Sequence, residues 1–182
     1  MKKNDTEKFL LNNLKISDGL EVKENEIEEF IDSSDTVFEQ CNHLFTTGIE
    51  FLKAGPNSGM PAPIPAWQNS RVSQKEINNG INVIEKMMLE ATPLLNDVTD
   101  LSDQYNEYCK DITSYMDNMS RLMTEFNEHK ENAASVQKSI FKLMEQLPPL
   151  DLRLNKLLAK SRKYNVRLQA LRQQLNLIKE VN

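Results

Sequence analysis

Apolar residues recur at helical spacing over residues 81–147, the longest such pattern in the chain. Steps of three and four residues from Ile81 reach twenty positions, of which seventeen are apolar or Cys. A pattern unbroken over more than nine heptads predicts a helix of the coiled-coil type. Pro93 lies on the outer face in this frame and predicts either a kink or a fresh helix start. Lys130 and Gln137 are polar residues at core positions, where such residues can set the pairing of coiled coils.

The apolar stripe of this segment is wider than a two-stranded coiled coil needs. The residue immediately before the first position of each heptad recurs every seven residues from Met87 to Leu143, and eight of these nine residues are apolar. A stripe three positions wide must be covered by several neighbours, so we expect a bundle of three or more helices. The chain supplies only part of that cover, which predicts a partner. For the six methionines of residues 87–144, core packing is the favoured interpretation over an adaptable binding groove.

The N-terminal part predicts two helices separated by an acidic linker. A short helix is expected at residues 5–14, and a longer one at residues 35–53. Thr36 and Glu39 fit a capping box at the start of the second helix, and Gly55-Pro56 ends it. The apolar stripe of the second helix comprises Phe38, Cys41, Phe45 and Leu52, with Val37, Leu44 and Ile49 beside it.

Residues 55–70 hold four of the seven prolines and the only tryptophan. This spacing favours an extended, polyproline-like backbone. One hypothesis is an ordered strap that docks Ile64 and Trp67 on a neighbouring helix. Two alternatives stay open, a flexible linker and a proline-rich ligand for a small binding domain.

The heptad pattern changes phase at Pro148 and Pro149. Beyond them a new frame is apolar at eight of nine positions from Leu150 to Ile178, whereas the earlier frame, if continued, is apolar at only half. A residue that precedes proline is pushed out of helical backbone, which predicts a break at Leu147. Pro149 suits the opening turn of a new helix. We therefore interpret the two prolines as a hinge between two interaction helices.

The charge changes sign at the same point. Residues 81–147 contain six basic and twelve acidic residues, whereas residues 148–182 contain eight basic and two acidic residues. In the frame that starts at Ile81, the acidic residues lie mostly away from the seam. The acidic and basic segments would therefore make few charge contacts if they paired as an internal hairpin. An outside helix edged with Asp or Glu is the favoured neighbour of the basic segment. Direct binding of this segment to nucleic acid or anionic lipid is the less favoured hypothesis.

These patterns assign partner binding to the leucine seam of the last segment and to its basic flank. The assigned residues are Leu154, Leu157, Tyr164, Leu168, Leu171, Leu175 and Ile178 in the seam, Arg153, Lys160 and Arg167 in the flank, and Pro148 and Pro149 as the hinge.

Composition supports an all-α fold. The last of the five glycines is Gly80, and aromatic residues make up 7% of the chain, which suits long helices better than sheets with frequent turns. We predict an elongated helical bundle or coiled coil with four segments. These are an acidic helical segment (1–54), a Pro-rich linker or strap (55–70), a long heptad helix (71–147) and a basic coiled-coil helix (148–182).

No motif for reaction chemistry is recognisable. His43 and His129 are the only histidines, and His43 near Cys41 does not form a zinc pattern. Phosphate-binding glycine loops and nucleophile elbows are absent from the sequence. We expect no enzyme, cofactor, metal or small-molecule substrate. The sequence also shows no secretory signal and no membrane span, so we expect a cytoplasmic protein with reduced thiols.

The stretch LLAKSRKYNVRLQALRQQLNLI, residues 157–178, resembles the C-terminal helix of pallidin- and snapin-like subunits of the complex for biogenesis of lysosome-related organelles. The shared features are an apolar pair with Ala, then Tyr164, Arg167 and the leucines that follow. The preceding SIFKLMEQLPPLDLRLNKLL is similar to the coiled-coil end of myrlysin-like subunits of the lysosome-positioning complex. Lys2 stands where the myristoylation glycine of myrlysin-like subunits lies.

The resemblance implies a non-enzymatic structural subunit, a scaffold that lies beside other coiled-coil subunits in a hetero-oligomeric complex. Such a complex works in endosomal and lysosomal vesicle trafficking or lysosome positioning and is peripherally attached to those membranes. The alternative is a subunit of a nuclear helical assembly, such as a kinetochore linker or a Mediator-type module. Neither hypothesis expects direct contact with nucleic acid.

Overall fold

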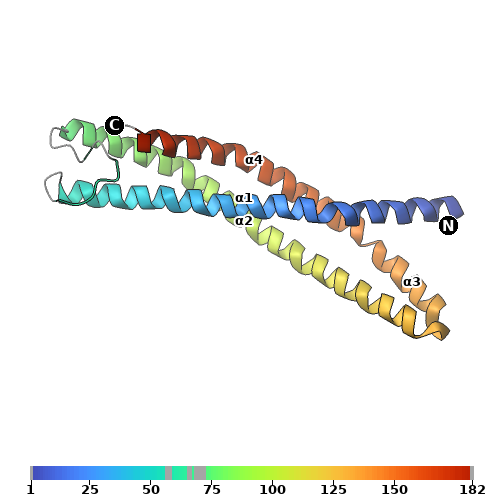
Figure 1. Ribbon diagram of the computed structural model, residues 1–182. Coiled ribbons are helices and arrows are strands. Elements are labelled where there is room, and N and C mark those ends of the chain that lie inside the picture. Colours follow the sequence, from blue (N-terminus) through green and yellow to red (C-terminus); the bar gives the residue numbers. More distant parts are fainter. Residues whose placement is uncertain (1, 56–58, 65–66, 68–72, 181–182) are drawn as a thin grey trace. The chain divides into compact units, whose positions relative to one another are not determined.

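The computed structural model describes residues 2–55, 59–64, 67 and 73–180. Its helices are α1 (Lys3–Ala54), α2 (Gln74–Glu128), the 3-10 helix η2 (Lys130–Asn132), α3 (Ala133–Met144) and α4 (Leu147–Glu180) (Figure 1). Within the described ranges no residue belongs to a strand. The predicted all-α helical fold is therefore confirmed.

The chain divides into two compact units. Unit 1 comprises Met1–Glu28 with Leu101–Lys160, and unit 2 comprises Glu29–Asp100 with Ser161–Asn182. Helices α1, α2 and α4 each contribute one part to each unit, whereas α3 belongs to unit 1 alone.

Helix α1 is continuous, so the prediction of two helices with an acidic linker is wrong. Thr36 is no cap, because its hydroxyl donates to the carbonyl of Asp32 within the helix. The expected linker is helical because its seam continues at heptad spacing while the acidic side chains occupy the other faces. One buried heptad position comprises Asn13, Leu20, Ile27, Ser34, Cys41 and Gly48, and another comprises Phe30, Val37, Leu44 and Phe51.

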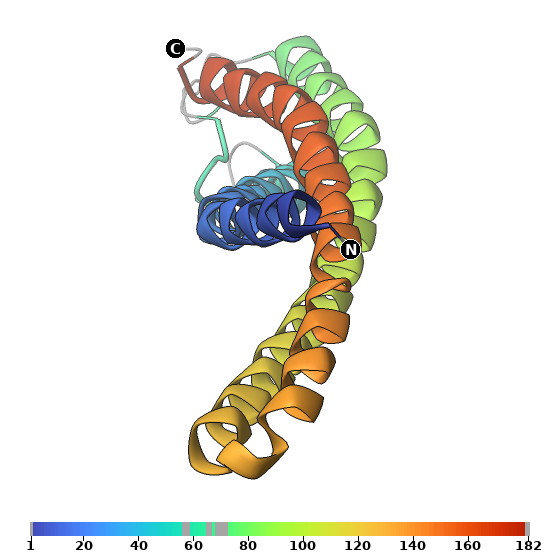
Figure 2. The same ribbon diagram turned by 90° about the vertical axis from the view of Figure 1, so that its right-hand side faces the viewer.

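Helix α2 ends at Glu128, so the helix expected to run to Leu147 is in fact two. The break lies where the sequence NEHKEN (127–132) offers no apolar residue to bury. A short 3-10 turn follows, with the amide of Asn132 donating to the carbonyl of His129. Both views show α3 returning beside α2 after this turn (Figures 1 and 2). Pro93 lies within α2, so the alternative of a fresh helix start at Pro93 is wrong.

The two prolines do not reverse the chain. Helix α3 ends at Met144, and Leu147 is the buried first residue of α4, contrary to the expectation that it leaves helical backbone. Pro148 and Pro149 lie in the first turn of α4, where a missing amide hydrogen costs no helical hydrogen bond. In both views α4 continues onward from α3 (Figures 1 and 2). A hinge motion at these prolines stays a prediction.

The buried seam of α2 is displaced from the frame that starts at Ile81. Leu95 and Met116, at first heptad positions of that frame, are 42% and 51% exposed. Periodicity alone could not choose between neighbouring stripes, because three adjacent heptad positions are all apolar. From Ile84 onward the buried positions are Ile84, Met87, Ala91, Leu94, Val98, Leu101, Tyr105, Tyr108, Ile112 and Tyr115, and before them Ile77 and Ile81 are buried as well.

Helix α4 lies antiparallel to α2 with a regular ladder of polar contacts between them. In unit 1, Arg153 pairs with Asp111 and Lys160 donates to Gln104. In unit 2, Arg167 pairs with Asp97 and Gln174 donates to Glu90. From one contact to the next, the residue number rises by seven on α4 and falls by seven on α2, which is a heptad register.

This ladder corrects the charge argument made from the sequence. Because the buried seam of α2 is displaced, Asp97 and Asp111 flank the seam and do not lie away from it. Arg167 and Arg153 of α4 meet these carboxylates. The internal hairpin that the charge pattern disfavoured is therefore the arrangement of the structure. Its register follows from the tight turn, because residue 132 lies midway between positions 111 and 153.

Helix α1 is joined to both other long helices within unit 1. The hydroxyls of Tyr105 and Tyr108 on α2 donate to Glu28 and Glu24 on α1, over 2.6 Å and 3.2 Å. Lys23 forms an ion pair of 2.8 Å with Asp151 on α4.

In unit 2, two residues of the Pro-rich segment pack on the helices. Ile64 and Trp67 are buried, and the indole stacks on the Phe51 ring with centroids 5.5 Å apart. A Cβ atom built at Gly80 of α2 would lie 2.2 Å from Cζ2 of Trp67. This burial agrees with the docked-strap hypothesis at Ile64 and Trp67. The prediction of a polyproline-like backbone also covers residues 56–58, 65–66 and 68–72, which lie outside the described residues.

Two glycine substitutions test this packing. Gly80→Ala should lower the free energy of unfolding by about 1–3 kcal/mol, because the new methyl group collides with an indole that Phe51 holds in place. Gly19→Ala, at a helical site with nothing within 4 Å of the new Cβ, should raise it by about 0.5–1 kcal/mol. Urea denaturation followed by circular dichroism measures both. A Gly80→Ala protein as stable as the parent would contradict the docking of Trp67.

Candidate functional site

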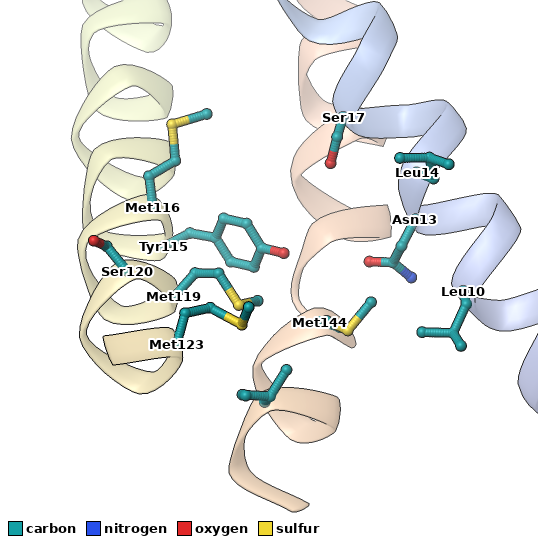
Figure 3. A pocket seen from close by; sticks show the side chains of 11 residues that line it. Leu10, Asn13, Leu14, Ser17, Tyr115, Met116, Met119, Ser120, Met123 and Met144 are labelled. Atoms are coloured by element: carbon teal, nitrogen blue, oxygen red, sulfur yellow. The ribbon is translucent and has the colours of Figure 1, made fainter. Parts of the chain in front are cut away.

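Unit 1 contains a groove between α1, α2 and α3 that is lined mostly by apolar side chains and has a volume of about 670 Å³ (Figure 3). Residues from all three helices line it. They are Leu10, Asn13, Leu14 and Ser17 of α1, Tyr115, Met116, Met119, Ser120 and Met123 of α2, and Ile140 and Met144 of α3.

The groove arises because the apolar stripes of α1 and α2 are wider than the surface that neighbouring helices cover. Leu10 and Leu14 lie beside the buried seam of α1, and Leu14 is 59% exposed. Across from them, Met116 and Met123 occupy the stripe of α2 that the displaced seam leaves outside the core, and both are exposed. Figure 3 shows the methionines of α2 and the leucines of α1 on opposite walls.

Helix α3 forms the floor of the groove. Ile140 and Met144 line it and are half-buried. Phe141, the next residue after Ile140, packs on Phe9 of α1 with ring centroids 6.2 Å apart. This contact ties α3 to the α1 wall.

Asn13 places an unpaired acceptor in this apolar surface. The side chain is only 3% exposed, and its Nδ2 donates to the carbonyl of Phe9. Its Oδ1 is buried without a hydrogen-bond partner, and Figure 3 shows this oxygen directed towards the groove. The Phe9 carbonyl fixes the amide, because a flipped amide would place two oxygens together. A buried unpaired acceptor costs roughly 1–3 kcal/mol.

Tyr115 supplies a second polar group. Its ring reaches from the α2 wall towards α1, with the hydroxyl at the groove (Figure 3). Burial raises the pKa of this phenol above its ordinary value, so the hydroxyl is neutral and available as a donor or acceptor at physiological pH.

Among the other partly buried ionisable groups of unit 1, Tyr105 and Tyr108 connect α2 to α1, whereas Cys109 interacts with Tyr105 of its own helix. Burial raises the pKa values of Tyr105, Tyr108 and Cys109. Burial also raises the pKa of Glu24, against the opposing effect of the hydrogen bond from Tyr108. Among the described residues no three His, Cys, Asp or Glu side chains are grouped so that they could hold a metal ion.

The residues assigned to partner binding lie elsewhere, along α4. Arg153, Lys160 and Arg167 make the polar contacts with α2, and Arg167 also lies 6.0 Å from the ring centroid of the half-buried Tyr164. The chain's own helices cover the remaining seam residues, so a partner would reach them only after the helices separate. The buried ones are Leu154, Leu157, Leu168, Leu171, Leu175 and Ile178. Partner binding by α4 stays a prediction.

Sequence reasoning did not bring the groove residues together. The methionines were the available signal, but core packing was the favoured interpretation for all six. Met87 is indeed buried, whereas Met116 and Met123 are exposed. Leu14 lies about a hundred residues from Met116 in the chain, so no local pattern could show that they face each other.

None of the described helices contains a stretch long and apolar enough to cross a membrane. Comparison with known proteins found no matching family model, no matching curated protein and no matching solved structure.

The raised pKa of Glu24 predicts a pH dependence of stability. A carboxyl whose pKa is raised on folding stabilises the fold fully below its unfolded pKa, and this contribution is lost as pH rises through the folded pKa. Glu24→Gln mimics the protonated form and keeps an acceptor for Tyr108. The variant should melt at a higher temperature than the parent at pH 7.5, and the difference should shrink towards pH 4.5.

Thermal melts by circular dichroism across this pH range measure the effect. Glu39→Gln, at an exposed position of α1, controls for removal of one negative charge. A Glu24→Gln protein that melts below the parent at pH 7.5 would contradict the burial of this carboxyl.

Proposed function

We propose that this protein is a non-enzymatic structural subunit of a hetero-oligomeric helical complex, and that the groove of unit 1 binds a helix of another subunit. The observation that carries the proposal is the contiguous exposure of Leu10, Leu14, Met116 and Met123 around one groove. Single exposed apolar side chains are normal, but a contiguous apolar surface marks an interaction site.

The physical basis is burial of apolar area. Each large apolar side chain that becomes fully buried contributes about 1.5–3 kcal/mol. Methionine side chains adapt their shape to a partner because they are unbranched and flexible. A helix laid in a groove between helices is a common mode of recognition.

We further propose a cellular setting in endosomal or lysosomal trafficking or lysosome positioning, with membrane attachment through the complex. The support is the resemblance of residues 157–178 to pallidin- and snapin-like subunits. The alternative is a nuclear helical assembly, which would use the same long helices and the same open groove. The identity of the bound subunits distinguishes the two settings.

Substitutions in the groove test the proposed function. Leu14→Asp and Met116→Asp place a charge at an exposed position, so the bundle should keep its fold while the partner helix loses affinity. Each variant, tagged and expressed as the full chain, should recover at least about tenfold less of its partners, which corresponds to about 1.4 kcal/mol. Quantitative mass spectrometry of the co-purified subunits measures the loss.

Leu89→Asp is the matched control, because Leu89 is also exposed but lies on α2 in unit 2. Substitutions of the buried Leu168 would disturb the fold itself and cannot serve this purpose. Unchanged recovery of partners by both groove variants, with a helical melt like that of the parent, would contradict the proposal.

A further inference from the structure

We propose that the occupant of the groove is an amphipathic helix of another protein, with Lys or Arg beside its apolar stripe and one polar donor within it. This inference rests on the proposed function, since it specifies the helix that the groove binds. It follows from the walls of the groove, the charge along its edges and the unpaired oxygen of Asn13.

The walls favour a helix over an extended peptide. Helices α1, α2 and α3 satisfy their backbone hydrogen bonds internally, so the groove offers no strand edge with which an extended backbone could pair. A helical occupant brings its own satisfied backbone and presents only side chains. The groove is also too open for an enclosed small-molecule site, because lining residues such as Leu14 and Met116 are more than half exposed.

The α1 edge of the groove is acidic. Glu7 precedes Leu10 by three residues, and Asp18 and Glu21 follow Leu14 and Ser17 by four, so helical spacing places all three carboxylates along this wall. All three are exposed. Of the basic residues at this end of α1, Lys8 and Lys15 lie on the face away from the groove, whereas Lys3 precedes Leu10 by seven residues and shares its face. Three carboxylates therefore stand against one ammonium group along this wall.

The other two helices do not reverse this balance. On α2, the exposed Asp117 and Arg121 each follow a lining residue by one position, Met116 and Ser120, so the margin of this wall carries one charge of each sign. On α3, Lys138 and Lys142 are each two residues from Ile140, and this spacing turns them to the opposite face. An occupant with Lys or Arg flanks is therefore complementary to the edges.

A second copy of this chain does not fit as the occupant. Its basic helix is α4, whose leucine seam is buried in its own bundle, including Leu154, Leu168 and Leu175. Presenting that seam to another copy would require the donor bundle to open. The occupant is therefore a helix of a different protein.

The unpaired Oδ1 of Asn13 specifies one further feature. Because this acceptor is buried within the apolar wall, an occupant gains a hydrogen bond if its stripe carries a donor such as Gln, Asn or Ser at that level. An occupant with Leu there would leave the acceptor unpaired. A single buried polar pair in a helical interface fixes the register of the helices.

Synthetic helical peptides test the inference with the full chain. Two fluorescent peptides of about 20 residues, roughly 30 Å as helices, would share a Leu and Met stripe with one central Gln. One carries Lys at the flanking positions and the other carries Glu. Fluorescence anisotropy should show at least about tenfold tighter binding of the Lys peptide, and its advantage should fall as salt is added.

Variants of the groove provide the controls. Glu7→Lys, Asp18→Lys and Glu21→Lys combined should reverse the preference between the two peptides. Leu14→Asp should weaken both, and Leu89→Asp in unit 2 should change neither. Asn13→Leu should raise the melting temperature of the free protein and remove any preference for central Gln over central Leu.

The outcomes separate this inference from the proposed function. Equal binding of Lys and Glu peptides would overturn the charge complementarity and leave the groove as a helix site. Binding of neither peptide, while Leu14→Asp still reduces recovery of natural partners, would overturn the inferred helix chemistry but not the proposed function. A fluorescent fatty acid that binds where no peptide does would overturn the inference in favour of a lipid site. Binding of neither peptide with unchanged recovery by the groove variants would overturn both proposals.

Discussion

The apolar stripe of α2 is three heptad positions wide, and the other helices pack according to how that stripe is covered. Two of its positions form the seam, where Tyr105 and Tyr108 meet α1 within unit 1 and α4 lies along the flank. The third position stays partly open. Towards the end of α2 it contributes Met116 and Met123 to the groove, so the covered seam and the open site have the same origin.

Polar contacts between the helices match the alignment of this apolar packing but do not set it. Exposed ion pairs such as Arg167 with Asp97 are each worth only about 0.2–1 kcal/mol, so they add little to stability. The tight turn at η2 sets the antiparallel register of α2 and α4, and the ladder of contacts follows at heptad intervals. Lys23 with Asp151 then relates α1 to the same hairpin in unit 1.

The sequence predicted individual helices better than the way they meet. The frame of α4 was correct because its stripe is narrow, and eight of its nine positions are buried with Tyr164 half-buried. The frame of α2 was displaced because its stripe is broad. In α1 the buried residues of the expected linker are Leu20, Ile27, Phe30 and Ser34 among many acidic residues, and this sparse apolar signal is why the helix was divided where it is continuous. The groove was not predicted, because its walls come from residues far apart in the chain.

The central claim is that one chain closes its own bundle and leaves the groove of unit 1 open to a partner helix. Carbodiimide coupling tests it, because this reagent joins an amine to a carboxylate in direct contact, such as Lys23 and Asp151 at 2.8 Å. In an equal mixture of isotope-labelled and unlabelled protein, the amide between these residues should form within single chains. Mixed-isotope links between them, or coupling of Lys23 only to carboxylates of α1, would contradict the account.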